Sequence, residues 1–164
     1  TWGTEMGVNW RDSPALTLAA NGGYLNARYK DFAFSGSTVL LPFDLSGQQM
    51  PKAPKWQASL SAALGQPISS GLNLAGNVLA AYPSNVLFKY SAVPGIVPNA
   101  AQPSYWLVNG RIGVKPPDDR LGFHLVADNL FDKQYYVGAD AGSFGNLLGY
   151  GQRRVVRGEM AIRF

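Results

Sequence analysis

Five charged or titratable side chains toward the end of the chain could carry chemistry: His124, Asp128, Arg157, Glu159 and Arg163. On one face of a strand, such groups can line the path of a charged solute, or they can neutralise one another as ion pairs. Nucleophilic catalysis needs a nucleophile, a base and a group that orients the base. The only His is His124, and no such set accompanies it. With no Cys and one His, we predict no catalytic site, no metal site and no cofactor.

A second group of candidates lies in a glycine-rich stretch between residues 131 and 154. Its aromatic side chains could bind a ligand or pack on one another: Tyr135, Tyr136, Phe144 and Tyr150. Arg153 and Arg154 could bind lipopolysaccharide phosphates or another anionic ligand. The glycines lack the Lys-Ser/Thr of a phosphate-binding loop, so they predict conformational freedom in a long loop rather than a nucleotide site.

These candidates are positioned by segments whose hydrophobicity alternates with a period of two. In the last ten residues, uncharged side chains such as Met160 and Phe164 alternate with Arg157, Glu159 and Arg163. Successive side chains of a strand point to opposite faces, so this pattern predicts one apolar and one charged face. Seven such segments are predicted, over residues 2–10, 15–29, 54–65, 72–82, 106–115, 121–128 and 155–164. The predicted fold class is all-β and antiparallel.

The apolar set of each segment is expected to face lipid, and the polar set to face the lumen of a barrel. His124, Asp128, Arg157, Glu159 and Arg163 are then lumen-facing, with His124 as a hydrogen-bonded filler. Shifting the last strand by one residue would point its charged side chains into the lipid hydrocarbon. For a basic residue at the midplane this costs about 2–4 kcal/mol of folding free energy. A terminal Phe164 against lipid also fits this register.

Connections between the segments alternate in length, which is typical of transmembrane barrels. They are short near residues 12, 67 and 117, and long near 40, 95 and 143. Outer-membrane barrels have short periplasmic turns and longer extracellular loops. Aromatic residues fall at the strand ends and predict two interfacial girdles: Trp56, Tyr82 and Trp106 beside long loops, and Trp10, Phe123 and Phe164 beside short turns.

Composition excludes other classes of protein. Charged residues make up 15% of the chain, compared with about 25% in an average soluble domain. No run of 18 apolar residues exists, so no membrane-spanning helix is predicted. The net charge of +4 is scattered along the chain, whereas nucleic-acid binders gather Lys and Arg on one face. Nucleic acid is therefore not an expected partner.

Two motifs resemble the C-terminal region of TonB-dependent outer-membrane receptors. One is Asn129-Leu130-Phe131-Asp132-Lys133-Gln134-Tyr135-Tyr136, followed by a glycine-rich stretch, paired arginines and a last strand that closes on Phe. The other is Leu45-Ser46-Gly47-Gln48-Gln49-Met50-Pro51-Lys52-Ala53-Pro54-Lys55-Trp56. Gln152-Arg153-Arg154 stands where the family usually has Pro-Arg before its last strand.

The resemblance implies a barrel of about 22 strands with a plugged lumen. Residues 1–164 would be its C-terminal segment, with the plug and the earlier strands N-terminal to Thr1. It implies the outer membrane of a Gram-negative bacterium, lipid and lipopolysaccharide as surroundings, and Phe164 as an assembly signal. It further implies active uptake of a scarce, bulky nutrient of the ferric siderophore, cobalamin or oligosaccharide class. Energy would come from TonB, through the N-terminal region that this chain lacks.

Strand parity supports the expectation of a longer protein. Bacterial single-chain barrels have even strand numbers, and a sheet left open in lipid would leave backbone groups unsatisfied. One alternative is a small closed or porin-like barrel for passive diffusion, with eight strands if residues Val39–Phe43 form another strand. A second alternative is a soluble all-β binding module. None of these interpretations is an enzyme.

Overall fold

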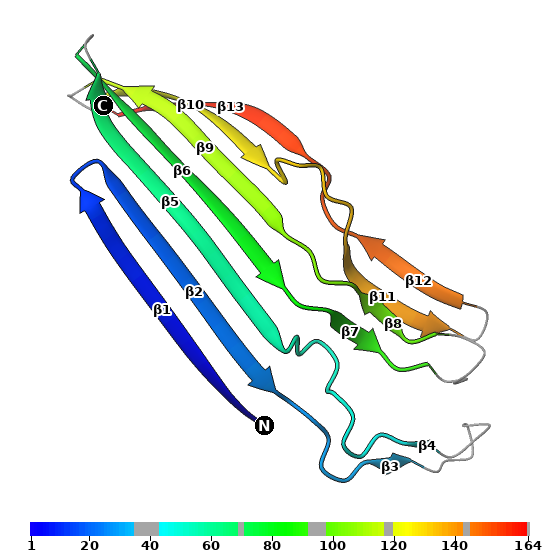
Figure 1. The fold of residues 1–164 in the computed structure, drawn as a ribbon. Coiled ribbons are helices and arrows are strands. Elements are labelled where there is room, and N and C mark those ends of the chain that lie inside the picture. Colours follow the sequence, from blue (N-terminus) through cyan, green and yellow to red (C-terminus); the bar gives the residue numbers. More distant parts are fainter. Residues whose placement is uncertain (35–42, 69–70, 92–97, 117–119, 143–144, 164) are drawn as a thin grey trace.

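A single curved antiparallel sheet forms the body of the computed structural model, which describes residues 1–34, 43–68, 71–91, 98–116, 120–142 and 145–163 (Figure 1). The sheet has seven strands in the order β1-β2-β5-β6-β9-β10-β13. Their bounds are β1 Trp2–Ser13, β2 Leu16–Asn26, β5 Trp56–Ile68, β6 Leu72–Pro83, β9 Leu107–Lys115, β10 Leu121–Asp128 and β13 Val155–Ile162. The seven predicted strands and the all-β class are confirmed. None of the described residues forms a helix long and apolar enough to cross a membrane.

The register of the sheet separates an apolar face from a polar face, as the alternation predicts. One row of cross-strand partners on the apolar face is Trp10, Leu18, Ala62 and Val78. The next row, on the polar face, is Asn9, Ala19, Ser61, Leu79 and Asn109. Since the period of a strand is two, each strand keeps this division along its length.

The two ends of the sheet differ in their connections. Short turns join β1 to β2, β5 to β6 and β9 to β10 at one end, whereas the other end carries the long connections (Figure 1). Each long connection contains a two-stranded hairpin: β3 (Ala33–Phe34) with β4 (Phe43–Asp44), β7 (Val86–Lys89) with β8 (Ala100–Gln102), and β11 (Tyr136–Gly142) with β12 (Gly145–Tyr150). The predicted segregation of loop lengths is confirmed.

The long connections were predicted as loops, but part of each forms paired strands. Cross-strand partners in β11 and β12 include Ala139 with Leu148 and Gly138 with Gly149, so the glycines lie within a ladder. Glycine has a low strand propensity, and pairing with a second strand overrides it here.

A second correction concerns the turn near residue 67. The structure continues β5 through Gly65, Gln66 and Pro67 to Ile68, opposite Leu72 of β6. Pro lacks an N–H and is tolerated only where no ladder partner needs one. On the β2 side of β5, the last hydrogen bond is donated by the N–H of Gly65 to Ala15 O, just before β2 begins (2.8 Å). The nitrogen of Pro67 faces the same side two residues later, where β2 has no residue opposite it. No ladder partner therefore needs an N–H at Pro67.

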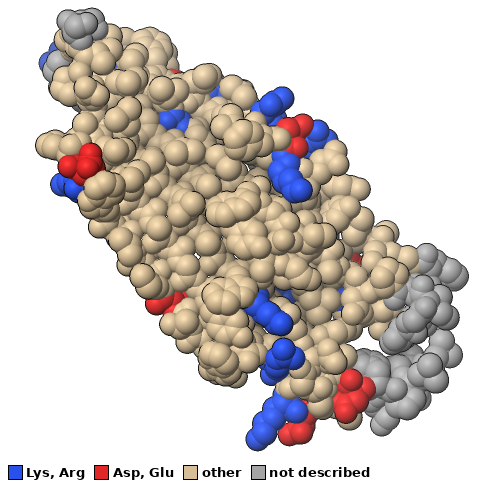
Figure 2. All heavy atoms as spheres, viewed as in Figure 1, with Lys and Arg blue, Asp and Glu red and all other residues tan. Residues whose placement is uncertain are grey.

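Little of the sheet is buried within the described residues. The buried apolar side chains are Ala27, Ala100 and Val126, whereas Trp10, Leu125 and many other large apolar residues are exposed. In Figure 2, uncharged side chains cover the middle of the visible face, and charges gather toward the strand ends and the β10–β13 side. A soluble sandwich would require a second sheet packed over the apolar face. The described residues contain no such second layer.

The described strands do not close into a barrel. The sheet is open between β1 and β13, its two edge strands. Of the eighth strand proposed for a small closed barrel, Phe43 belongs to β4 and pairs with β3 rather than with the sheet. The remaining residues of that segment lie outside the described ones.

Candidate functional site

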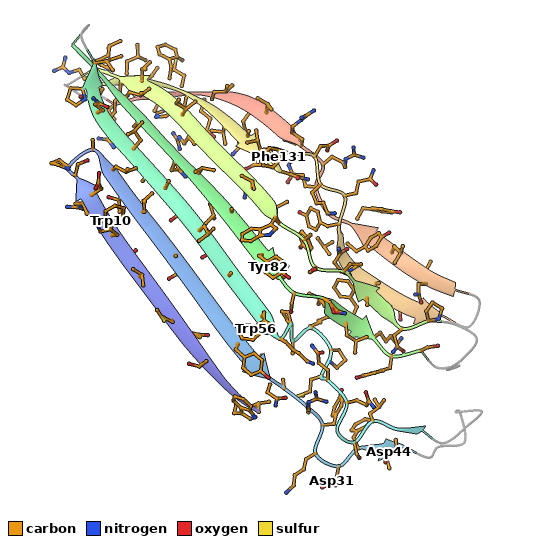
Figure 3. The ribbon with its side chains drawn as sticks, viewed as in Figure 1. Trp10, Asp31, Asp44, Trp56, Tyr82 and Phe131 are labelled. Carbon is orange, nitrogen blue, oxygen red and sulfur yellow. The ribbon has the colours of Figure 1, made fainter. Side chains whose placement is uncertain are left out.

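Aromatic side chains mark both ends of the apolar face. Trp2, Tyr24 and Trp56 form a cluster at the hairpin end, with ring centroids 5.3 and 4.6 Å apart. Trp10 lies at the short-turn end of β1, and Trp56 and Tyr82 lie at the hairpin end (Figure 3). Tyr82 also contacts Trp106, with centroids 5.1 Å apart. The aromatic residues thus lie where the two predicted girdles require them; Phe164 lies outside the described residues.

The height of this face can be estimated from the register. Phe123, near the short turns, shares its row with Val114 and Leu74. From Leu74 to Tyr82 is eight residues of β6, about 26 Å at the usual rise of a strand. This length is of the same order as the apolar band of outer-membrane barrels, roughly 25 Å.

The polar face carries a cluster of charges on β9, β10 and β13. Val126 lies between Arg111 and Arg157 in the register. Glu159 forms an ion pair with Arg111, whose Nη2 lies 3.3 Å from Oε2, and accepts a hydrogen bond from Arg157 Nε (3.2 Å); Arg157 also pairs with Asp128. Four of these side chains therefore form one ion-pair network, which favours the interpretation of charges paired with their neighbours. Arg111 was not among the predicted site residues. The alternation could have identified it, because it places Arg111 on the polar face of the strand whose apolar face carries Val108 and Ile112.

His124 lies beside this network, between two glycines. A Cβ placed at Gly113 would come within 2.3 Å of the His124 ring, and one at Gly122 within 3.1 Å, so the ring occupies space that a side chain at either position would need. Its Nδ1 is buried and has no hydrogen-bond partner among the residues that the structure describes. The expected filler role fits this packing, but the expected hydrogen bond is not made at Nδ1. The described residues contain no group of His, Cys, Asp and Glu that could hold a metal.

Arg163 follows β13 at the short-turn end. Its N–H donates to Arg120 O (2.8 Å), which places its backbone beside the start of β10. Of the predicted set, the structure brings together Asp128, His124, Arg157 and Glu159 on the polar face.

At the other end, two of the hairpins form one unit. The buried side chain of Gln102 in β8 accepts from the N–H of Tyr136 in β11 (2.7 Å). Lys89 Nζ lies 2.5 Å from Asp140 Oδ1, joining β7 to β11. The rings of Tyr105 and Tyr135 stack with centroids 5.0 Å apart. Burial, followed by the nearby Tyr135, raises the pKa of the Tyr105 hydroxyl.

The predicted ligand-binding tyrosines are largely engaged within this unit. Tyr135 stacks on Tyr105, and Tyr136 meets Tyr150 edge-on at 5.1 Å. Tyr150 is still 64% exposed and Leu147, which sequence reasoning missed, is 77% exposed. Phe144 lies outside the described residues. The exposed apolar surface of β11 and β12 is therefore carried by other residues besides the predicted tyrosines.

A hollow of about 970 Å³ lies on the polar face next to the hairpin end. Its hydrogen-bonding groups include Glu5, Asn21, Gln57, Ser59 and Tyr105. Asn21 Nδ2 donates to Ser59 Oγ (3.3 Å). Apart from Glu5, the named groups are neutral, so the hollow offers hydrogen bonds to a polar ligand and a single fixed negative charge.

The Asn-Leu-Phe-Asp segment is hydrogen-bonded to the residues that precede β13, at the base of the β11/β12 hairpin. Asn129 is 3% exposed; its Nδ2 donates to Lys133 O and Gln152 O, both at 2.9 Å, and its Oδ1 accepts from the N–H of Lys133 (2.8 Å). Asp132 receives two hydrogen bonds from Arg153 (2.8 and 2.5 Å) and one from the N–H of Arg154 (3.0 Å). We call residues 129–135 and 151–154 the neck.

The neck changes the interpretation of the paired arginines. Hydrogen bonds from Arg153, followed by the N–H of Arg154, hold the pKa of Asp132 well below its usual value of 3.8. Arg153 is thus committed to a carboxylate of its own chain. Arg154 Nη1 lies 3.5 Å from Leu130 O, so its side chain lies along the neck. Within the described part of the chain it forms no ion pair with a carboxylate.

Two solved structures share the arrangement of sheet and hairpins. The ferric yersiniabactin uptake receptor FyuA from Yersinia pestis superposes with a TM-score of 0.75 at 18% identity, over 99% of this chain and 23% of FyuA. FpvA from P. aeruginosa, solved with a heterologous pyoverdine and iron, superposes with a TM-score of 0.61 at 20% identity, over 96% of this chain and 18% of FpvA.

This chain therefore spans less than a quarter of the length of either receptor. No protein-family model and no curated protein sequence matches it. At these identities the likeness concerns the fold alone. The fold resembles that of the β-barrel portion of these two receptors.

Proposed function

We propose that this chain is the C-terminal barrel segment of an outer-membrane receptor that imports a ferric siderophore. The observation that carries the proposal is the superposition of nearly the whole chain, hairpins included, on two receptors: one is a ferric yersiniabactin uptake receptor, and the other was solved with a pyoverdine and iron. The exposed apolar face between two sets of aromatic residues supports placement in the outer membrane of a Gram-negative bacterium. Cobalamin and oligosaccharides remain the other ligand classes implied by the resemblance.

Within this proposal the parts of the chain have distinct tasks. The β7/β8 and β11/β12 hairpins, with Tyr150 exposed, would meet the ligand outside the cell. The hollow beside Tyr105 and the network around Arg157 would line the lumen, where a plug N-terminal to Thr1 would sit. TonB would act through that absent region, and Phe164 would serve as the assembly signal against lipid. The receptor would have no catalytic role.

The test uses the full-length protein expressed in a Gram-negative host that lacks its own ferric siderophore receptors. A folded species that resists detergent until boiled, recovered from the outer membrane, is expected first. Uptake of siderophore-bound radiolabelled iron is then expected, and it should stop when TonB is deleted. Uptake that persists without TonB would indicate passive diffusion. Protein found only in the soluble fraction would refute the membrane proposal.

Ligand class is resolved by competition in the same strain. Labelled cobalamin and a labelled oligosaccharide are supplied in place of the siderophore. We expect neither to enter in a TonB-dependent manner. Energised uptake of either one, with no uptake of iron, would replace the siderophore class while leaving the receptor function intact.

A further inference from the structure

The neck closes the connection between β10 and β13 at its base. Asn129 and Gln152 are 23 residues apart in sequence and are joined by a hydrogen bond, as are Asp132 and Arg153, 21 residues apart. The N–H of Gly151 also donates to Tyr135 O (2.8 Å). Closing a long loop at its ends costs conformational entropy, and these bonds offset that cost immediately before β13 begins.

The hydrogen bonds of the neck do not involve the hairpin above it. The described neck residues bond to one another, and on the other side to β9: Asn129 N–H donates to Asn109 Oδ1 and Leu130 N–H to Val108 O, both at 2.8 Å. The hairpin is held separately, through Gln102 and Lys89 of the neighbouring hairpin. The wall and the hairpin are therefore anchored by separate sets of hydrogen bonds, and the ring of Tyr135, which stacks on Tyr105, is the contact between the neck and the hairpins.

The residue types of the neck suit its backbone. Asn129 and Asp132 have positive φ angles of 51° and 53°. Asn and Asp adopt this conformation more readily than other residues with a side chain. The same two side chains make the hydrogen bonds of the neck, so backbone shape and bonding depend on the same positions.

We propose that the neck is a positioning site that sets the pairing of β10 with β13 independently of the β11/β12 hairpin. Asn129 and Asp132 are its positioning residues. The hairpin can then be altered for ligand recognition while the register of the last strand is retained. This inference concerns the wall itself and does not depend on which nutrient is transported.

The experiment compares neck variants with a hairpin deletion in the full-length protein. Asn129→Gly keeps the positive φ but removes the side-chain bonds, and Asp132→Asn keeps the shape but removes the charge. The deletion replaces residues 137–149 with Asn-Gly, a two-residue turn that suits the cross-strand partners Tyr136 and Tyr150. Asp140→Asn, which breaks only the exposed pair with Lys89, is the matched control.

Register is read directly from engineered cysteines, because the chain contains none. Ala127 and Val156 are cross-strand partners, and Gly158 would replace Val156 after a slip of two residues. A disulfide between Ala127→Cys and Val156→Cys reports the native pairing. A disulfide between Ala127→Cys and Gly158→Cys reports the slipped pairing. The rate of unfolding in urea is measured in parallel.

We expect both neck variants to unfold about tenfold faster or more and to lose native cross-linking. Asn129→Gly removes three side-chain hydrogen bonds. Asp132→Asn removes the ion pair with Arg153 and the hydrogen bond at Oδ2. The hairpin deletion and Asp140→Asn should keep the native cross-link and unfold within about twofold of wild type. The proposal is overturned if the deletion is as damaging as the neck variants, or if Asn129→Gly changes neither readout. Absence of the wild-type protein from membranes would count against the proposed function alone, because both readouts apply equally to soluble protein.

Discussion

The ring of Tyr135 lies against the backbone of Gly151, so closely that a Cβ at residue 151 would come within 2.2 Å of Cζ of Tyr135. The same ring stacks on the ring of Tyr105, with centroids 5.0 Å apart. A side chain at residue 151 must therefore displace the ring or the chain beneath it. Gly151 couples the neck to the aromatic packing of the hairpins.

Gly151→Ala should consequently lower the free energy of unfolding by about 1–3 kcal/mol, the usual cost of overpacking. Gly138→Ala in β11 is the matched control, because no atom lies within 4 Å of a Cβ placed there. Urea denaturation of the detergent-solubilised full-length protein measures both. Equal losses of unfolding free energy in the two variants would show that Gly151 is needed for its backbone freedom rather than for its contact with Tyr135.

Asp132 should make the free energy of unfolding depend on pH in the acidic range. Its pKa is lower in the folded chain than its usual 3.8, so its ionised form stabilises the fold at pH values above about 4. That contribution is lost as the pH falls below about 4 toward the lowered pKa of the folded state. Between pH 7 and about 3, wild type should lose more stability than Asp132→Asn, as measured by urea unfolding. Parallel pH profiles would contradict an ion pair with Arg153.

The two faces of β5 can be distinguished by one substitution at neighbouring positions. Ala62 lies in the apolar row with Trp10 and Leu18, whereas Ser61 lies in the polar row with Ala19. Ala62→Arg should destabilise the folded barrel by about 2–4 kcal/mol, the cost of a basic residue facing lipid at the midplane.

Ser61→Arg should have a small effect, because its side chain would face water or polar groups. The measurement is reversible unfolding from lipid vesicles, with the folded fraction read by heat-modifiable gel mobility. If Ser61→Arg proves the more damaging of the two, the lipid face has been assigned to the wrong side.

The ion-pair network of the polar face should show modest coupling. Glu159 contacts both Arg111 and Arg157, and all three side chains are partly exposed. Exposed pairs contribute about 0.2–1 kcal/mol, so a double-mutant cycle with Arg111→Gln and Glu159→Gln should give a coupling energy in that range. Chemical denaturation of the four proteins provides it. A coupling energy of zero would mean that the two side chains act independently.

The alternation of side chains was enough to predict the wall. The outward positions Trp56, Leu60 and Leu64 and the inward positions Gln57 and Ser59 are those of the register, because a period of two is imposed by the strand itself. Strand ends were less predictable. Pro67 resembles a turn residue when read locally, and its place in β5 depends on where β2 stops, which is a property of the sheet.

The hairpins and the neck could not be predicted from periodicity. Gly138 and Gly149 weaken the pattern of β11 and β12, and the contacts that order the hairpin come from distant Gln102 and Lys89. The side chains of Asn129 and Asp132 were noticed as part of a motif, but a motif does not state which backbone groups they bind. Their roles emerge only from pairing with residues 152–154.

The projecting end of β5 has a consequence for solubility before assembly. Beyond Gly65, β5 has β6 on one side and no β2 residue on the other. An exposed strand edge offers N–H and C=O groups to any passing chain and invites aggregation. Pro67 removes a donor from that edge, so a partly folded chain has one fewer site at which a second copy could add a strand.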